Sequence, residues 1–237
     1  MPPSRRTVSP NRLLAALPQR DAQRMLAACE AVELAFGAIL YEPDAHIDHV
    51  YFPTDSFVSL MIPVDARASL EVGLVGNEGM VGTPLILGVD VSPLRALVQG
   101  PGPALRLPAP AFSRVLGRCP ALRRMLHTYL QVQMRQLAQT AACTRYHVVE
   151  ARLARWLLMT QDRAHMDGFH VTHEFLAYML GVRRVGVTKA ANALQQRKLI
   201  RYHRGEVTIL DRAGMEAASC GCYRTDRQTY ESALGTA

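Results

Sequence analysis

The feature that most constrains the fold is the stretch from residue 171 to 210, which reads VTHEFLAYMLGVRRVGVTKAANALQQRKLIRYHRGEVTIL. Thr172 is well suited to cap a helix N-terminus, and Glu174 favours the positive end of the first turn. An apolar face follows at Phe175, Leu176 and Met179. Gly181 then stands where a tight turn between two helices needs a residue without a Cβ atom. The sequence therefore predicts a short helix that ends in a tight turn.

A second helix is predicted to begin near Arg183. Its inner face repeats at the i, i+3, i+4, i+7 spacing of an amphipathic helix, with Val187, Ala190, Ala191 and Leu194. The opposite side of its N-terminal half carries Arg184, Val185, Thr188 and Lys189. The following LIRYH, RG and EVTIL segments predict a β-hairpin with Gly205 at its turn. Two helices, a tight turn and a hairpin are typical of a winged helix-turn-helix.

The distribution of charge indicates an anionic partner for the second half of the chain. The net charge is +7, yet residues 1–110 hold 8 basic and 11 acidic residues. Residues 111–170 hold 9 basic and 3 acidic residues, and residues 171–212 hold 8 and 3. Phosphate contacts need Lys and Arg, whereas the cores of protein interfaces are depleted in Lys. We therefore predict double-stranded DNA as the partner, rather than another protein bound by a generic helical hairpin.

The residues before this unit have a different character. Residues 10–29 predict short helices interrupted at Pro18, and residues 30–108 alternate short apolar runs with Gly, Pro, Asp and Asn, as in an all-β sandwich or roll. Helices are predicted near 110–117, over 120–145 and over 148–163, with a loop at AHMDGFH. The predicted fold class is α+β: an N-terminal antiparallel β-roll with flanking helices (10–118), a long dimerisation helix (119–145) and a winged helix-turn-helix domain (146–237).

The long helix is predicted to carry two apolar stripes. Pro120 suits the first helical position, and neither Gly nor Pro follows before Arg145. The stripe assigned to dimerisation consists of Leu122, Met125, Tyr129, Val132 and Gln136, and continues to Cys143. The second consists of Leu126, Leu130, Leu137 and Ala141. A helix of this kind can pack on its own domain with one stripe and on a partner helix with the other, which predicts a homodimer. The alternative is one buried core helix.

The cysteines do not predict a disulfide framework, because the five are scattered and odd in number. Only Cys220 and Cys222 are close. Structural zinc usually takes four ligands from pairs with wider spacing, so no metal site is predicted there and the role of this pair stays open. No apolar run is long enough for a membrane span, and no apolar segment follows the basic N-terminus as in a secretory signal. We therefore expect a cytoplasmic protein.

With these elements in order, the chain resembles the Crp/Fnr family of bacterial transcription regulators. The resemblance is carried by VTHEFLAYMLGVRRVGVTKAANALQQRKLI with its following hairpin, and by the order of β-roll, long helix and winged helix-turn-helix. It implies a cyclic-nucleotide-binding-like β-roll and a dimerising helix. It also implies a DNA-binding domain that places one recognition helix per subunit in the major groove of a near-palindromic site, with no enzymatic activity.

The resemblance also implies roles for single residues. The family's recognition helix presents Arg, Glu and Arg to bases. Arg184 matches the first and is expected to reach a guanine, Val185 replaces the Glu, and Lys189 replaces the last Arg without its planar fork. Gly186 replaces a hydroxyl residue that contacts phosphate. The expected phosphate contacts are Thr172, Arg183, Thr188 and Arg204.

The effector pocket implied by the family is degenerate in this sequence. Its closest segments are GNEGMVGTP and PLRAL, which place Glu78, Thr83, Leu94 and Arg95 at the pocket. Thr83 replaces the ribose-binding Glu and Leu94 replaces the phosphate-binding Arg. Arg95 lies one residue after the position of the phosphate-binding Arg, which in a strand places its side chain on the opposite face. Burying the charged phosphate of a cyclic nucleotide in an apolar β-roll costs free energy when no cation lies beside it. Cyclic AMP and cyclic GMP are therefore not expected as effectors.

Other effectors and functions remain as alternatives. An iron–sulfur centre would need several cysteines near the N-terminus, where only Cys29 is found, so none is expected. Haem bound through His46, His49 or a methionine stays open, although AHIDH is typical of a polar loop. A cupin-like metal enzyme using the same two histidines lacks obvious further ligands, since Glu71 and Glu78 do not clearly converge on them. The other alternative is a signalling adaptor that no longer binds DNA. An activator would also contact RNA polymerase, but no motif identifies such a surface.

Overall fold

The computed structural model describes residues 11–64 and 68–235, and the chain forms two compact units. Of the described residues, the first unit contains 11–58 and 75–129, and the second contains 59–64, 68–74 and 130–235. Residue 10 and residues 236–237, at the ends of the predicted segments, lie outside the described residues. The three-part division of the sequence stays a prediction, because the limit between the two units falls inside the long helix.

The first unit begins with two helices, α1 (Arg12–Ala15) and α2 (Gln19–Ala28), and Pro18 interrupts them as predicted. Asn11 caps α1, because its side-chain oxygen accepts a hydrogen bond from the Leu14 N–H at 3.3 Å. Its amide nitrogen donates to the carbonyl oxygens of Pro53 and Gly79, at 3.0 and 2.8 Å. A single buried side chain therefore connects the start of α1 to the backbone at residues 53 and 79.

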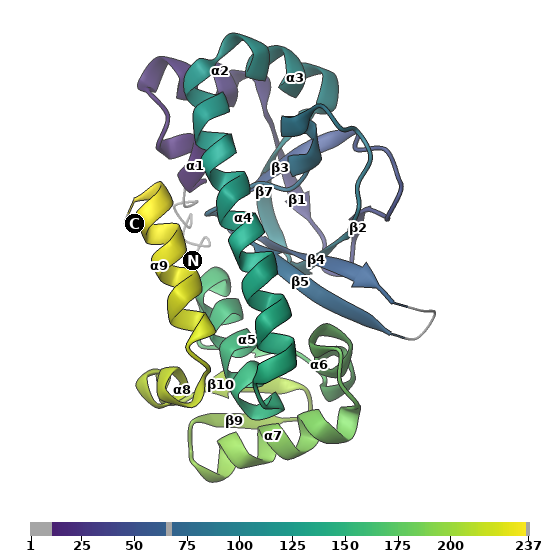
Figure 1. The fold of residues 1–237 in the computed structure, drawn as a ribbon, viewed down its shortest axis with the longest axis vertical. Helices are drawn as coiled ribbons and strands as arrows, with labels where there is room; N and C mark the ends of the chain where they lie inside the picture. The colour runs from purple at the N-terminus through teal and green to yellow at the C-terminus, as the bar shows by residue number, and fades with distance from the viewer. Residues whose placement is uncertain (1–10, 65–67, 236–237) are drawn as a thin grey trace, which may run out of the picture. The chain divides into compact units, whose positions relative to one another are not determined.

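The predicted antiparallel β region is confirmed (Figure 1). One sheet has the strand order β1-β7-β3 and the other has the order β2-β6-β4-β5. The strands are β1 (Glu30–Leu34), β2 (Ile39–Tyr41), β3 (His49–Pro53), β4 (Phe57–Pro63), β5 (Ser69–Val75), β6 (Arg95–Gly100) and β7 (Gly102–Pro108). A 3₁₀ helix, η1 (Thr83–Leu87), and the helix α3 (Ala109–Arg118) also belong to the first unit, whereas most of β4 and β5 belongs to the second. Its core includes the fully buried Phe52, Met80, Leu107 and Phe112.

The long helix α4 (Pro120–Tyr146) confirms the predicted helix, and both of its predicted stripes contain buried residues, since Leu126 of the second stripe is also fully buried. Four of the five residues assigned to dimerisation are buried within the single chain: Leu122, Tyr129, Val132 and Gln136, with Met125 partly buried. The Tyr129 hydroxyl donates to the carbonyl oxygen of Met80 at 3.4 Å. These side chains contribute to the core of their own chain, and their assignment to a dimer interface stays a prediction. The exposed large apolar residues of α4 are Met134, Leu137 and Tyr146, at 69%, 41% and 78%.

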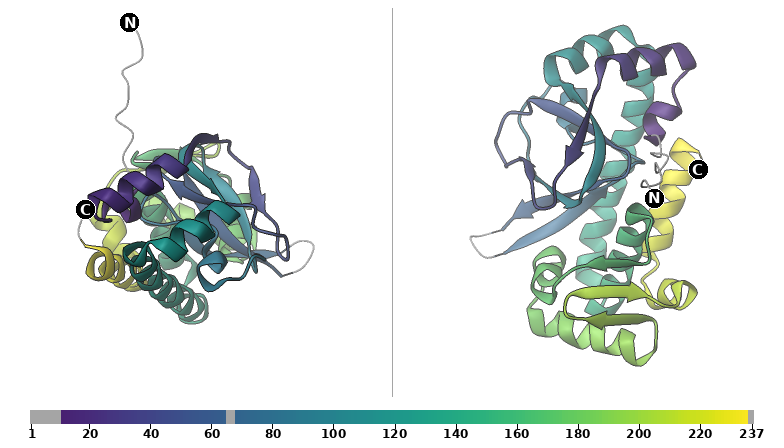
Figure 2. Two further views of the ribbon diagram at one scale, coloured as in Figure 1. Left: turned by 90° about the horizontal axis from the view of Figure 1, so that it is seen from above. Right: turned by 180° about the vertical axis from the view of Figure 1, so that it is seen from behind.

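The second unit contains the helix α5 (Val149–Ala164), followed by α6 (His173–Leu180) and α7 (Arg184–Gln196). A three-stranded sheet with the order β8-β10-β9 accompanies them (Figure 2). Its strands are β8 (Gly168–His170), β9 (Ile200–His203) and β10 (Glu206–Ile209). The predicted hairpin corresponds to β9 and β10. The segment predicted as a loop instead contains β8, because residues 168–170 pair antiparallel with β10, with His170 opposite Glu206.

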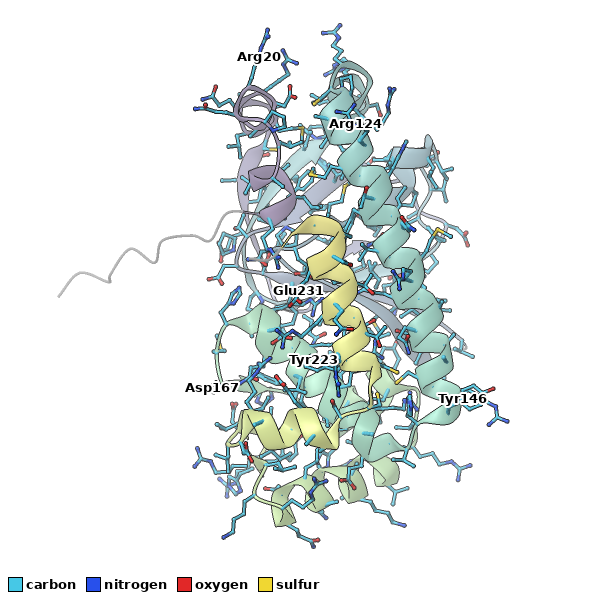
Figure 3. All side chains as sticks on the ribbon, turned by 60° about the vertical axis from the view of Figure 1, so that its left-hand side comes forward. Arg20, Arg124, Tyr146, Asp167, Tyr223 and Glu231 are labelled. Atoms are coloured by element: carbon cyan, nitrogen blue, oxygen red, sulfur yellow. The ribbon has the colours of Figure 1, made fainter. Side chains whose placement is uncertain are left out.

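The C-terminal residues form two helices that the sequence analysis did not predict, α8 (Arg212–Ala218) and α9 (Cys222–Leu234). The Arg212 guanidinium donates to Asp162 of α5 at 2.6 Å and to the Tyr223 hydroxyl at 2.6 Å. The Tyr223 hydroxyl in turn donates to the other Asp162 oxygen at 2.9 Å. Figure 3 labels Tyr223 and Glu231, which both belong to α9. The helices α8 and α9 are thus bonded to α5 through polar side chains.

None of the helices in the described parts of the chain is both long and apolar enough to span a lipid bilayer.

Candidate nucleic-acid interface

The turn between α6 and α7 has the geometry that its sequence predicts. The Thr172 hydroxyl accepts a hydrogen bond from the Phe175 N–H at 3.1 Å and caps α6. Gly181 ends α6 with a φ of 62°, in the left-handed region that glycine adopts without strain. A Cβ atom there would also lie 3.1 Å from Leu70 Cδ1. The start of α6 and its turn are therefore both set by local sequence.

The helix α7 has one buried face and one exposed basic face. Its buried residues are Val187, Ala190, Ala191 and Leu194, which match the predicted inner face. Arg184, Val185 and Lys189 lie on its other side, and Val185 is 59% accessible although it is apolar. Arg183 precedes the helix at its N-cap and makes no side-chain capping bond. The three residues predicted to contact bases therefore lie on the accessible side of one helix.

The four predicted phosphate contacts differ in how accessible they are. Thr172, Arg183 and Arg204 are exposed. Thr188 is partly buried, its hydroxyl donates to the Arg184 carbonyl oxygen at 3.1 Å, and the same hydroxyl oxygen lies 3.1 Å from His173 Nδ1. The Thr188 hydroxyl is thus already used inside the protein, which makes it the least available of the four.

Arg204 lies at the tip of the β9–β10 hairpin. It forms a two-residue turn with Gly205, since His203 pairs with Glu206 directly across the hairpin. Both turn residues have positive φ angles, 51° for Arg204 and 86° for Gly205, as in a type I′ turn. The turn projects an exposed arginine from the wing, in agreement with the predicted glycine turn.

His173 was missed by sequence reasoning although it joins α6 to both α7 and the wing. Its ring stacks on Tyr202 of β9, with centroids 4.5 Å apart and planes 8° from parallel. Burial lowers the pKa of His173, and the positive charge of Arg184 acts in the same direction. No spacing rule links residues 173 and 202, so the sequence carried no signal for this stack.

The predicted effector-pocket residues are placed around the β-roll. The Arg95 Nε donates to Glu42 Oε2 at 2.8 Å, while the neighbouring Ala96 and Val98 are fully buried. Residues 95 and 96 point to opposite faces of β6, so Arg95 lies on the face opposite the buried side. Glu78 is buried and accepts a hydrogen bond from the Gly76 N–H at 3.2 Å. Leu94 precedes β6 and Thr83 begins η1. The degenerate effector pocket stays a prediction.

The histidines considered for haem or a cupin-like site take part in other contacts. His46 is exposed and lies 3.3 Å from Asp90, and the His49 ring packs beside that of Tyr51, with centroids 6.3 Å apart. Within residues 11–64 and 68–235, the group of potential metal ligands consists of Cys143, His147, Cys220 and Cys222, all in the second unit. It includes neither His46 nor His49.

Comparison with known proteins identifies part of the second unit. The sequence model of the Crp-like helix-turn-helix domain matches residues 151–218, which contain α6, α7, the wing and α8 together with most of α5. This part of the chain is a Crp-like helix-turn-helix domain. The match confirms the resemblance to the Crp/Fnr regulators on the residues that first suggested it. A comparison with curated protein sequences gives no match.

Solved structures extend the likeness beyond the Crp-like domain to most of the chain. FixK2 from Bradyrhizobium japonicum is 12% identical with a TM-score of 0.67, and the alignment covers 81% of this chain and 98% of that one. The c-di-GMP responsive global regulator CLP of Xanthomonas campestris is 17% identical with a TM-score of 0.66, and the alignment covers 81% of this chain and 99% of that one. A transcriptional regulator of the CRP/FNR family from Thermus thermophilus is 20% identical with a TM-score of 0.66, and the alignment covers 80% of this chain and 98% of that one. The chain therefore has the Crp/Fnr fold, and neighbours of this fold are named as regulators rather than enzymes.

Proposed function

We propose that the protein is a homodimeric, sequence-specific transcription regulator that inserts α7 of each subunit into the DNA major groove. The observation that carries this proposal is the accessible face of Arg184, Val185 and Lys189 at the N-terminal half of α7, within a Crp-like helix-turn-helix domain. The N-terminal residues of the second helix contact base edges in this type of domain.

The three base-contacting residues define a distinct specificity. Arg184 donates two hydrogen bonds to guanine O6 and N7, the commonest specific contact in the major groove. Val185 offers no acceptor for a cytosine amino group and instead contacts a thymine methyl group. Lys189 donates to guanine or to phosphate as a point charge. The preferred half-site therefore differs from one read by Arg, Glu and Arg.

Contacts to the DNA backbone come from the start of α6, from the turn before α7 and from the wing. Arg183 and Arg204 are exposed cations, and Thr172 has a hydroxyl hydrogen that capping leaves available, since that hydroxyl accepts from the Phe175 N–H. Thr188 contributes less, because its hydroxyl is bonded within the protein. Such contacts fix the orientation of the domain on DNA without reading sequence.

The dimer is proposed to form through the accessible side of α4. Leu130, Met134, Leu137 and Ala141 are spaced by four, three and four residues, as in a coiled-coil seam. Met134 and Leu137 are large apolar side chains that are exposed in the single chain. A partner helix packed on this seam would cover them, whereas the buried stripe with Tyr129 supports the fold of the subunit itself.

The signal to which the protein responds is proposed not to be a cyclic nucleotide. Thr83 and Leu94 supply neither the carboxylate nor the cation that a cyclic nucleotide requires, and Arg95 is paired with Glu42. Calorimetric binding of cyclic AMP at submicromolar concentration would show that this part of the proposal is wrong.

The decisive experiment is selection of DNA sites from a random pool by the purified full-length protein, followed by footprinting. We expect a near-palindrome whose half-site centres are about 34 Å apart, one helical turn. Recovery of no symmetric site would refute the proposal. A mobility shift without sequence preference that weakens steeply with salt would indicate electrostatic binding alone, and no shift at all would favour the adaptor alternative.

A further inference from the structure

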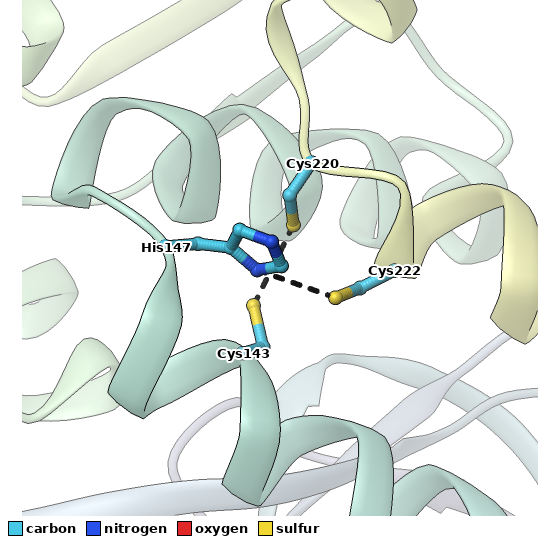
Figure 4. Close-up of side chains that lie close together, drawn as sticks. All are labelled: Cys143, His147, Cys220 and Cys222. Carbon is cyan, nitrogen blue, oxygen red and sulfur yellow. Dashed lines mark hydrogen bonds between the residues drawn. The ribbon is translucent and has the colours of Figure 1, made fainter.

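Four potential metal ligands from two distant segments meet in the second unit (Figure 4). Cys143 lies in the last turn of α4, and His147 follows four residues later, just beyond the helix end. Cys220 lies between α8 and α9, and Cys222 is the first residue of α9. The three cysteines are buried and the histidine is exposed. Two chain segments thus bring their thiols and an imidazole to one point.

The distances between the ligand atoms fit a single small ion. The Sγ atoms of Cys143 and Cys220 are 3.5 Å apart, and Cys222 Sγ is 3.4 Å from His147 Nδ1. All four ligand atoms lie within 4.8 Å of one another. A tetrahedral zinc ion with Zn–S bonds of about 2.3 Å and a Zn–N bond of about 2.0 Å separates its ligand atoms by roughly 3.5 to 3.8 Å.

We propose that Cys143, His147, Cys220 and Cys222 bind one zinc ion, which serves as a structural clip in the second unit. Three cysteines and one histidine are an established ligand set for structural zinc. All four positions of a tetrahedron are filled by the protein, so no position remains for a reacting water or substrate. The site is therefore structural rather than catalytic.

Two buried arginines lie near the ligands, since Arg152 and Arg155 both interact electrostatically with Cys143. The Gln139 amide donates to Cys222 Sγ at 2.9 Å, a contact that orients the sulfur. Zinc with three thiolates carries one net negative charge, which Arg155 and the nearby Arg152 offset. On binding, the thiol protons pass to solvent, and no electron transfer is needed.

Two other occupants fit the geometry less well. A Cys143–Cys220 disulfide would bring two sulfurs to about 2.05 Å and would leave Cys222 and His147 without a role. An iron–sulfur cluster distributes its thiolates around several iron atoms, whereas these ligand atoms converge on one point.

A zinc ion here would tie α9 to the end of α4. The two segments are 77 residues apart in sequence at Cys143 and Cys220, so the ion would close a long loop and restrict the unfolded chain. Other contacts across the same helices already exist, since the Tyr230 hydroxyl of α9 donates to Gln136 of α4 at 3.1 Å. The ion would therefore strengthen an arrangement that the side chains already support.

The test is the metal content of the full-length protein, purified with a thiol reductant and without chelators. We expect about one zinc per chain by mass spectrometry. Replacement of zinc by Co²⁺ should give the intense visible bands of a tetrahedral ion and a thiolate-to-cobalt band in the near ultraviolet. The variants Cys220→Ala and Cys222→Ala should lose these signals, whereas Cys29→Ala, outside the cluster, should keep them.

A second variant separates metal binding from folding. His147 is exposed, so His147→Ala should retain the circular dichroism of the wild type while its zinc dissociation constant rises at least about tenfold in competition with a chelator. Zinc far below one per chain in folded wild-type protein would overturn the proposal. Zinc content that is unchanged in Cys220→Ala and His147→Ala would do the same, and so would a brown chromophore with bound iron. None of these outcomes depends on DNA binding, so the proposed function is tested separately.

Discussion

The carboxylate of Asp226 in α9 lies 2.5 Å from the guanidinium of Arg155 in α5, and both side chains are buried. Removing one member of such a pair leaves the other charge buried and uncompensated. We expect Asp226→Ala to lower the free energy of unfolding by about 3–5 kcal/mol, measured by urea denaturation of the full chain.

The matched control is Glu231→Gln on the same helix. Glu231 is exposed and lies 3.4 Å from Arg227, so its loss should change stability by less than about 1 kcal/mol. Equal effects of the two substitutions would mean that the Arg155–Asp226 pair is not protected from solvent.

Arg184→Ala should weaken binding to the selected DNA site by about 1–3 kcal/mol, because a bidentate contact to guanine is lost. Binding to unrelated DNA should change much less, and so should the unfolding curve, since Arg184 is exposed. Fluorescence anisotropy at one fixed salt concentration measures both affinities. Arg224→Ala, an exposed arginine of α9 outside the Crp-like domain match, serves as the charge-matched control. A similar loss in both variants would indicate a general charge effect.

Val185→Glu should change sequence preference rather than overall affinity. A carboxylate at this exposed position can accept a hydrogen bond from a cytosine amino group, which valine cannot. Selection of sites with the variant should enrich a C·G pair at the position where the wild type tolerates T. An unchanged consensus would place Val185 away from the bases.

Leu137→Glu should dissociate the dimer, because it places a charge in the proposed α4 seam. The unfolding free energy of the monomer should change little, since the side chain is exposed in the single chain. Sedimentation equilibrium measures the dissociation constant. Leu122→Ala, on the buried stripe, should instead lower stability by about 2–5 kcal/mol with a smaller effect on dimerisation. The reverse pattern would restore the buried stripe as the interface.

Glu71 of β5 should make stability depend on pH near neutrality. Burial raises the pKa of Glu71 from 4.5 to about 7, although the Ser59 hydroxyl donates to its carboxylate at 2.7 Å. A carboxyl with a raised pKa binds its proton more tightly in the folded chain. Its stabilising contribution is therefore complete below pH 4.5 and is lost as the pH rises through about 7. Glu71→Gln should remove this loss, as urea denaturation between about pH 5 and pH 8 would show. A pH dependence identical to that of the wild type would assign the effect to another group.

The sequence predicted best where structure depends on nearby residues. The helix-turn-helix follows from a cap at Thr172, a left-handed glycine at 181 and a regular apolar repeat in α7. The hairpin follows from a two-residue turn at Gly205. These signals act over a few residues, so the elements around them lie close to their predicted limits.

Prediction failed where the outcome depends on distant packing. Both predicted stripes of α4 contain buried residues, whereas Met134, which belongs to neither stripe, is exposed. The strand β8 exists because β10 pairs with it. The Cys/His cluster was missed for the same reason, although the i, i+4 spacing of Cys143 and His147 was a signal that could have drawn attention to the C-x-C pair.

The match to the Crp-like domain ends at residue 218, before α9 begins. A fragment cut at residues 151–218 would retain Arg155 without Asp226, and it would contain none of the four clustered ligands. We therefore expect the folding unit to extend beyond the residues of the sequence match. We expect the smallest stable DNA-binding fragment to begin within α4 and to extend beyond Tyr230, so a truncation designed from sequence similarity alone would test a damaged protein.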